Sequence, residues 1–286
     1  MSSPHRPAAP LGVASSQLPT AAGARRLAKS FPAAFTAGAV IGTLGGLIGL
    51  GGAEFRLPLL IGVFGFIALQ AVILNKAMSL IVIITALPSR LASVPYAQVA
   101  PHWFVAVNLL AGSLVGAWVG ANWATKMRSG TLYKVLAALL VLVAATLALT
   151  HFGDVGSLHL DPALRTVIGL LAGAAIGVVA ALMGVAGGEL LIPTIVLLFG
   201  LDIKIAGSLS LVVSLPTMLV AFARYSQDES FQVMRSNKTF VLAMAGGSIA
   251  GTITGGLLLG VIPTAVLIPG LVALLLLSSY KVWHHK

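Results

Sequence analysis

The sequence of 286 residues has no cysteine and few charged residues, which make up 8% of the chain. The lack of cysteine excludes a disulfide scaffold, a thiolate metal site and a cysteine nucleophile. Soluble domains carry about 25% charged residues, so the shortage of charge excludes a water-soluble globular enzyme. Acidic residues number only seven, against 17 lysines and arginines. Because the basic residues lie in short stretches between long apolar runs, we interpret them as signals of membrane topology and expect no nucleic-acid partner.

Hydrophobic residues form 58% of the chain and gather in long runs. A bilayer core about 30 Å thick needs about 20 apolar residues per helix. Eight runs approach this length: 31–50, 77–92, 103–124, 132–150, 163–182, 206–223, 240–260 and 264–279. Two shorter runs, 57–69 and 190–200, each follow a glycine cluster and contain a proline, which is typical of re-entrant segments or half-helices. The sequence predicts an all-α polytopic membrane protein with eight to ten transmembrane segments, in which two short segments are broken by glycine and proline.

The positions of basic residues predict the orientation of the chain. Arg25, Arg26 and Lys29 precede the first apolar run and place the N-terminus in the cytoplasm. When crossings are counted from there, the basic loops fall on the same side; they carry Lys76, Lys126, Arg128, Lys134, Arg224, Arg235, Lys238 and Lys281. We therefore expect a multi-pass inner-membrane protein with both termini in the cytoplasm.

The chain also repeats itself at a shift of 135 positions. The first motif, Gly49, Gly52, Glu54 and Pro58, falls on the second, Gly184, Gly187, Glu189 and Pro193. Farther along, Gly112-Ser113 and Gly116 fall on Gly247-Ser248 and Gly251, and small residues four apart predict close helix packing. Between these matches the register slips by about four, where Ser79 and Leu80 match Ser210 and Leu211.

Each unit holds five apolar runs, an odd number, so the second unit enters the membrane from the opposite face. The sequence therefore predicts two inverted-topology repeats, which are typical of secondary transporters. The predicted divisions are a disordered cytoplasmic leader (1–30), a first repeat (31–150), a non-cytoplasmic linker (151–165), a second repeat (166–280) and a cytoplasmic tail (281–286).

The two glycine clusters predict breaks in transmembrane helices. Consecutive glycines tolerate positive φ, and a proline a few residues later suits the first turn of a new half-helix. The backbone amides at the start of such a half-helix carry partial positive charge and favour anions. We therefore predict that an anion binds at these breaks, near Gly51, Gly52, Gly187 and Gly188.

Glu54 and Glu189 are the only acidic residues within the apolar units, and they are repeat equivalents. A charged acid at mid-bilayer costs roughly 2.5–3.5 kcal/mol on insertion scales, so retaining two of them indicates a use, or a shielded site in which they stay protonated. One interpretation is a proton-titrating or substrate-gating pair. The other is that each glutamate caps its half-helix through the backbone amides.

Arg56 has no counterpart in the second repeat, where Leu191 stands. Its guanidinium would suit a sulfonate or carboxylate by bidentate hydrogen bonds; alternatively it pairs with Glu54 or extends to the membrane surface. Polar residues also begin the next helix of each repeat, either as contacts to a site between the halves or as helix caps: Asn75, Lys76, Ser79, Ser208 and Ser210.

No catalytic or metal-binding pattern accompanies these residues. The histidines lack HExxH spacing, no serine lies in a nucleophile motif and no Walker A loop occurs. We therefore expect neither an enzyme nor a bound metal or cofactor, and the expected partners are a small anion, the lipid bilayer and a coupling proton or cation.

With its duplicated glycine-rich breaks, the chain resembles the sulfite exporter TauE/SafE family over residues 33–279. The residues that match its two motifs are Gly49, Gly51, Gly52 and Pro58, then Gly184, Gly187, Gly188 and Pro193. Ala53 and Ala186 depart from the glycine runs and leave the backbone path there open. The resemblance implies a permease for sulfite, sulfonates or related organosulfur anions. A passive anion channel, or a membrane scaffold without transport activity, is the alternative.

Overall fold

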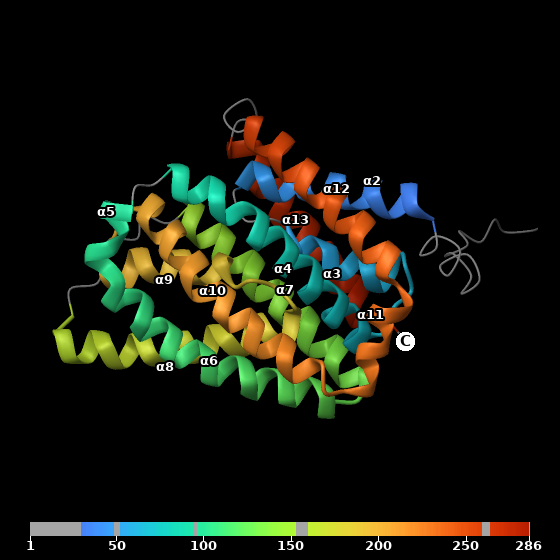
Figure 1. Ribbon diagram of the computed structural model, residues 1–286, viewed down its shortest axis with the longest axis horizontal. Coiled ribbons are helices and arrows are strands. Elements are labelled where there is room, and N and C mark those ends of the chain that lie inside the picture. The colour runs from blue at the N-terminus through green and yellow to red at the C-terminus, as the bar shows by residue number, and fades with distance from the viewer. Residues whose placement is uncertain (1–29, 49–51, 94–95, 153–159, 259–263, 286) are drawn as a thin grey trace, which may run out of the picture.

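The computed structural model describes residues 30–48, 52–93, 96–152, 160–258 and 264–285, which form helices and loops without a strand (Figure 1). The main helices of the first half are α2 (Phe31–Ile48), α3 (Ala53–Gly62), α4 (Ala68–Ser93), α6 (Trp103–Lys126) and α7 (Ser129–Phe152). Those of the second half are α8 (Pro162–Met183), α9 (Gly188–Phe199), α10 (Ile203–Tyr225), α12 (Lys238–Leu257) and α13 (Thr264–Trp283). Short helices connect them: α5 (Tyr96–Val99), η1 (Ala100–His102), η2 (Glu229–Phe231) and α11 (Gln232–Ser236).

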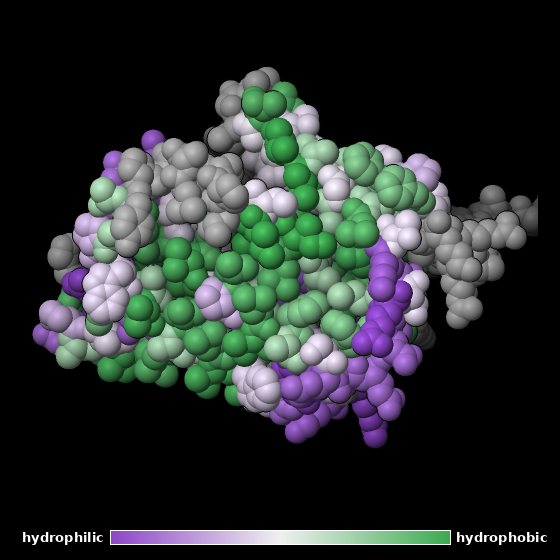
Figure 2. Space-filling view, in the orientation of Figure 1, coloured by the Kyte–Doolittle hydropathy of each residue, from purple (hydrophilic) through white to green (hydrophobic). Residues whose placement is uncertain are grey.

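Several of these helices match the thickness of a membrane. Within the described residues, six are long and apolar enough to span one: Ala68–Thr85, Ala97–Lys126, Ser129–Thr150, Pro162–Met183, Ile203–Tyr225 and Lys238–Leu257. Three further apolar helices are shorter: Phe31–Leu47, Gly188–Phe199 and Leu267–Trp283. Hydrophobic residues cover the middle of the face in Figure 2, and hydrophilic residues gather at its lower right, toward α11, and at its left edge. The chain is a multi-pass membrane protein, and the count of eight to ten segments stays a prediction.

Two helix starts differ from those that the apolar runs predict. α3 begins at Ala53 and ends at Gly62, whereas the run covers residues 57–69. α4 begins at Ala68, well before the run that starts at Ala77. The reason is the same in both cases: polar residues interrupt the apolar pattern but lie inside the helix. In α3 they are Glu54 and Arg56, and in α4 they are Asn75 and Lys76.

Glycines hold two helix pairs at close range. α2 packs along α12, and α6 packs along α8 (Figure 1). A side chain on Gly42 would collide with the backbone of Ser248, and one on Gly177 would collide with the backbone of Ser113. These two contacts are related by the shift of 135 positions. The predicted packing role of the glycine–serine runs is confirmed, since Gly112 and Gly247 make equivalent approaches to α8 and α2.

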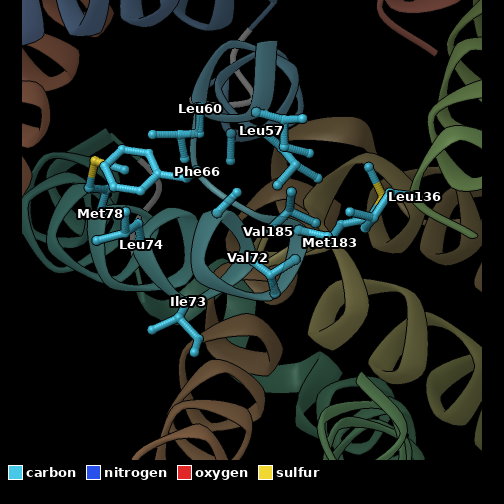
Figure 3. Packing of buried hydrophobic residues seen from close by; sticks show 14 of the residues in the cluster. Leu57, Leu60, Phe66, Val72, Ile73, Leu74, Met78, Leu136, Met183 and Val185 are labelled. Carbon is cyan, nitrogen blue, oxygen red and sulfur yellow. The ribbon is translucent and has the colours of Figure 1, made fainter. Parts of the chain in front are cut away.

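The loop between α8 and α9 is buried in the middle of the molecule. Met183 and Val185, on either side of Gly184, belong to the same apolar cluster as Leu57 of α3 and Val72 of α4 (Figure 3). A side chain on Gly184 would collide with the backbone of Val72. The end of α8 therefore lies against α4 and close to α3, which brings the second break toward the first.

Candidate functional site

Each short helix begins at a glycine in the left-handed conformation. Gly52 precedes α3 with φ of 71°, and Gly187 precedes α9 with φ of 86°. At Gly52 a side chain would also lie 2.5 Å from the carbonyl oxygen of Ile41. The prediction that these two glycines interrupt the helices is confirmed. Gly188 is the first residue of α9. Gly51, the fourth glycine predicted to bind the anion, lies outside the described residues.

Glu54 and Glu189 are each the second residue of their short helix, and both are buried. Their carboxyl groups lie close enough for their charges to interact. Neither oxygen of Glu54 has a hydrogen-bond partner among the described residues. The left-handed turn at Gly52 starts α3, and the carboxyl of Glu54 lies close to that of Glu189. The role of Glu54 as a helix cap stays a prediction.

Arg56 is fully buried, one turn into α3. Its Nη1 donates to Oδ1 of Asn75 at 3.4 Å and to Oγ of Ser79 at 3.3 Å, and its Nη2 donates to Oγ of Ser248 at 3.3 Å. Its Nε has no partner among the described groups. Arg56 therefore neither reaches the membrane surface nor spends its hydrogen bonds on Glu54. Neutral side chains accept these hydrogen bonds and orient the guanidinium, while Glu54 lies close enough for the two charges to interact.

Asn75 joins the two breaks. Its Nδ2 donates to the carbonyl oxygen of Ala53 at 3.0 Å and to that of Met183 at 3.1 Å. The first carbonyl lies at the start of α3, and the second lies at the end of α8. Asn75 and Ser79 are thus not helix caps at the membrane interface, because both are buried within α4. The structure brings both of them to Arg56, as a site between the halves requires.

The assignment of Lys76 to a cytoplasmic loop is wrong. Lys76 is buried inside α4, and its Nζ donates to the carbonyl oxygens of Ala180 and Val185 at 2.7 Å each. The carbonyl of Ala180 lies in the last turn of α8, where it also accepts from the backbone amide of Val185, and the ammonium group adds a charged donor to this helix end. The hydroxyl of Tyr225 donates to the carbonyl oxygen of Ala181, at 2.9 Å. Hydropathy counting missed this role because it treats every lysine as a surface charge.

The hydroxyl groups at the related positions of α10 and α6 bond to groups other than Arg56. Oγ of Ser208 donates to the carbonyl of Lys204, and Oγ of Ser210 donates to that of Gly207, both within α10. Ser113 and Thr217 share a hydrogen bond of 2.6 Å between their hydroxyl oxygens. The structure therefore does not bring Ser208 or Ser210 to the guanidinium of Arg56.

The register slip predicted between the repeats does not occur in the helices. α4 begins at Ala68 and α10 at Ile203, which keeps the shift of 135. The counterpart of Ser79 is accordingly Ser214, whose buried hydroxyl has no partner among the described residues. Ser210 is the counterpart of Asn75. The Ser-Leu pair at Ser210 lies four residues, about one helical turn, before Ser214. The sequence comparison therefore matched Ser79 to the wrong serine.

Ser248 is the site residue that the sequence analysis missed. It was noticed only as part of a packing motif, yet its hydroxyl is fully buried and accepts a hydrogen bond from Arg56. The sequence held one signal: Ser248 lies in a run of small residues that predicts a close helix contact.

A comparison with known proteins agrees with this architecture. No curated protein and no solved structure matches the chain. A family model described as "Sulfite exporter TauE/SafE", a family of membrane transporters, matches residues 7–147 and 155–282. These two stretches hold both glycine–glutamate breaks and every residue of the polar site. The chain belongs to the sulfite exporter TauE/SafE family.

Proposed function

We propose that this protein is a secondary transporter that moves small anions across the cytoplasmic membrane. The substrates we infer are organosulfur compounds such as sulfite or sulfonates, in keeping with the family. The observation that carries the proposal is Arg56, a buried guanidinium whose hydrogen bonds all go to neutral side chains. No carboxylate accepts a hydrogen bond from this guanidinium, and its Nε has no partner among the described groups, so an oxoanion could take hydrogen bonds there.

The binding site lies where the two breaks meet. Arg56 would take the anion by its guanidinium fork, and Asn75, Ser79 and Ser248 hold that fork in place. The backbone amides at the starts of α3 and α9, beside Gly52 and Gly187, would add partial positive charge to the site. Glu54 and Glu189 would gate the site or couple it to protons.

Alternating access follows if the two halves are inverted-topology repeats. Supporting this, α2, α3, α4, α6 and α7 correspond in order to α8, α9, α10, α12 and α13. The first residues of α4 and α10, and the glycine contacts of the two helix pairs, keep the same shift of 135. Two such units rocking against each other around a central site is the usual mechanism of this architecture.

We also propose that both termini face the cytoplasm. Basic residues near the predicted cytoplasmic loops lie at neighbouring helix ends: Arg224 at the end of α10 donates to Oδ1 of Asn122 in α6 at 2.9 Å. Lys134 in α7 lies 5.8 Å from the ring of Trp283 at the end of α13. Basic residues gathered at neighbouring helix ends are in keeping with the positive-inside rule, which places such residues in the cytoplasm.

The test is flux in proteoliposomes. Purified protein would be given sulfite, methanesulfonate, small carboxylates and sulfate in turn, with and without an imposed proton gradient. Saturable flux with counterflow would support a carrier, whereas flux without saturation would identify a passive channel. No flux of any anion from protein with a normal melting transition would overturn the proposal in favour of a scaffold.

A further inference from the structure

Four buried ionisable side chains form a row across the two breaks, in the order Arg56, Glu54, Glu189, Lys76. Their exposed fractions are 0%, 2%, 8% and 1%. Each member is close enough to the next for their charges to interact: Arg56 with Glu54, Glu54 with Glu189, and Glu189 with Lys76. The row therefore has a cationic side chain at each end and two acidic side chains between them.

Hydrogen bonds to the backbone fix this order. The amide group of Asn75 binds both the start of α3 and the end of α8, so the two glutamates on the first turns of α3 and α9 are held near each other. The ammonium group of Lys76 is bound to Val185, just before α9. Among the described residues, Tyr225 also brings a titratable side chain to the end of α8, where its hydroxyl donates to the carbonyl oxygen of Ala181.

The charge of this row depends on the protons that the two acids hold. With both glutamates ionised the row is neutral, but two carboxylates side by side in a buried place repel each other strongly. Neither oxygen of Glu54 has a hydrogen-bond donor among the described residues to relieve that repulsion. A single proton shared between the two carboxyl groups removes it and leaves the row with a net charge of plus one.

We propose that the row binds one monovalent anion together with one proton, so that transport is electroneutral and favours monoanions over dianions. This rests on the proposed transport function and specifies its substrate class: singly charged oxoanions such as sulfonates, hydrogen sulfite or monocarboxylates. The anion's charge balances the row when Glu54 and Glu189 share one proton. A dianion such as sulfate requires a second proton on the same pair. Lys76 thereby sets the charge that the site accepts.

The experiment measures proton movement and anion movement in the same vesicles. Proteoliposomes containing a trapped pH dye are given methanesulfonate, and the membrane potential is set by valinomycin and potassium. We expect about one proton per methanesulfonate and no response of the flux to potential. Potential-driven methanesulfonate flux without proton movement would overturn this inference while leaving the transport function standing. No saturable flux of any anion, from protein with a normal melting transition, would overturn both.

Variants of the row give a second test. E54Q and E189Q replace an acid that shares the proton, and the double variant is expected to lower the proton-to-anion ratio from about one to near zero. E229Q is the matched control, because Glu229 is exposed outside the site. An unchanged ratio in the double variant would overturn the proposal.

Lys76 is tested through the charge preference. K76M lowers the charge of the row by one, so methanesulfonate flux at low concentration is expected to fall about tenfold or more, and K76R is expected to restore most of it. K238M is the matched control, because Lys238 is exposed. If K76M keeps wild-type flux and the wild-type proton ratio, Lys76 does not set the charge and the proposal is wrong.

Discussion

The two halves of the molecule share a scaffold but carry different chemistry. Around Arg56, the first half supplies Asn75 and Ser79, and α12 supplies Ser248. The shift of 135 relates these residues to Ser210 and Ser214 of α10 and to Ser113 of α6, with Leu191 in place of the arginine. Leu191 is buried in a separate apolar cluster with Leu109 and Ile195.

This difference indicates that the two halves share a helical scaffold but not the proposed binding chemistry. The shared part is the left-handed glycine, the glutamate on the first turn and the glycine contacts between helix pairs. The unshared part is positive charge, because the counterparts of Arg56 and Lys76 are Leu191 and Leu211. Both cations therefore come from the first half, and the anion should be bound asymmetrically, close to α3 and α4.

The largest expected effect is the loss of the guanidinium. R56Q removes charge-assisted hydrogen bonds worth roughly 1.5–3 kcal/mol each, so flux at low substrate should fall about ten- to a hundredfold. R56K keeps the positive charge but lacks the planar guanidinium, so its flux should lie between those of R56Q and the wild type. R235Q is the control, since Arg235 is exposed. Wild-type flux in R56Q would remove Arg56 from the site.

Moving the arginine to the other half sharpens the comparison further. The double variant R56L/L191R should stay at least about tenfold below wild type, because Ser113 and Ser210 already bond elsewhere and no amide replaces Asn75. Its melting temperature should also fall, since an arginine enters an apolar cluster. Recovery of full flux would mean that the halves are interchangeable, contrary to this account.

A smaller difference in flux is expected between variants of Ser248 and of Ser113, its counterpart at the shift of 135. S248A removes a neutral partner of Arg56 and should lower flux about two- to tenfold, as expected for one hydrogen bond. S113A removes a bond to Thr217 that does not involve Arg56 and should leave flux unchanged. Initial rates from both variants, measured at equal protein density, make the comparison. Equal losses in both would indicate a symmetric site.

No difference between the halves is expected for the packing glycines. G42A and G177A each place a methyl group against the backbone of a neighbouring helix and should lower the free energy of unfolding by similar amounts, about 1–3 kcal/mol. Melting in detergent checks this. A large effect from only one substitution would show that the two helix pairs are not equivalent.

Much of the fold was predictable because it depends on patterns that are local in sequence. Glycine clusters followed by proline identified both breaks, and the shift of 135 identified the matching helices. Arg56, Glu54 and Glu189 stood out because charge is costly within an apolar segment. Asn75 and Ser79 were also named, although their contact with Arg56 was not.

The rest depended on contacts between distant parts of the chain. Lys76 was misassigned because its two carbonyl partners lie in α8, more than a hundred residues away. Ser248 was missed because its role requires α2 and α12 to approach through Gly42. The helix start at Ala68 was missed because hydropathy records the polarity of a residue and not whether a partner satisfies it.

The most direct test of the central claim is a structure determined with methanesulfonate bound. The account predicts density for the anion between the two breaks, with its oxygens on Arg56 and near the start of α3, and none in the apolar surroundings of Leu191. An anion bound at Leu191 and the serines of the second half, or only at the exposed residues Arg235 and Lys238, would contradict it.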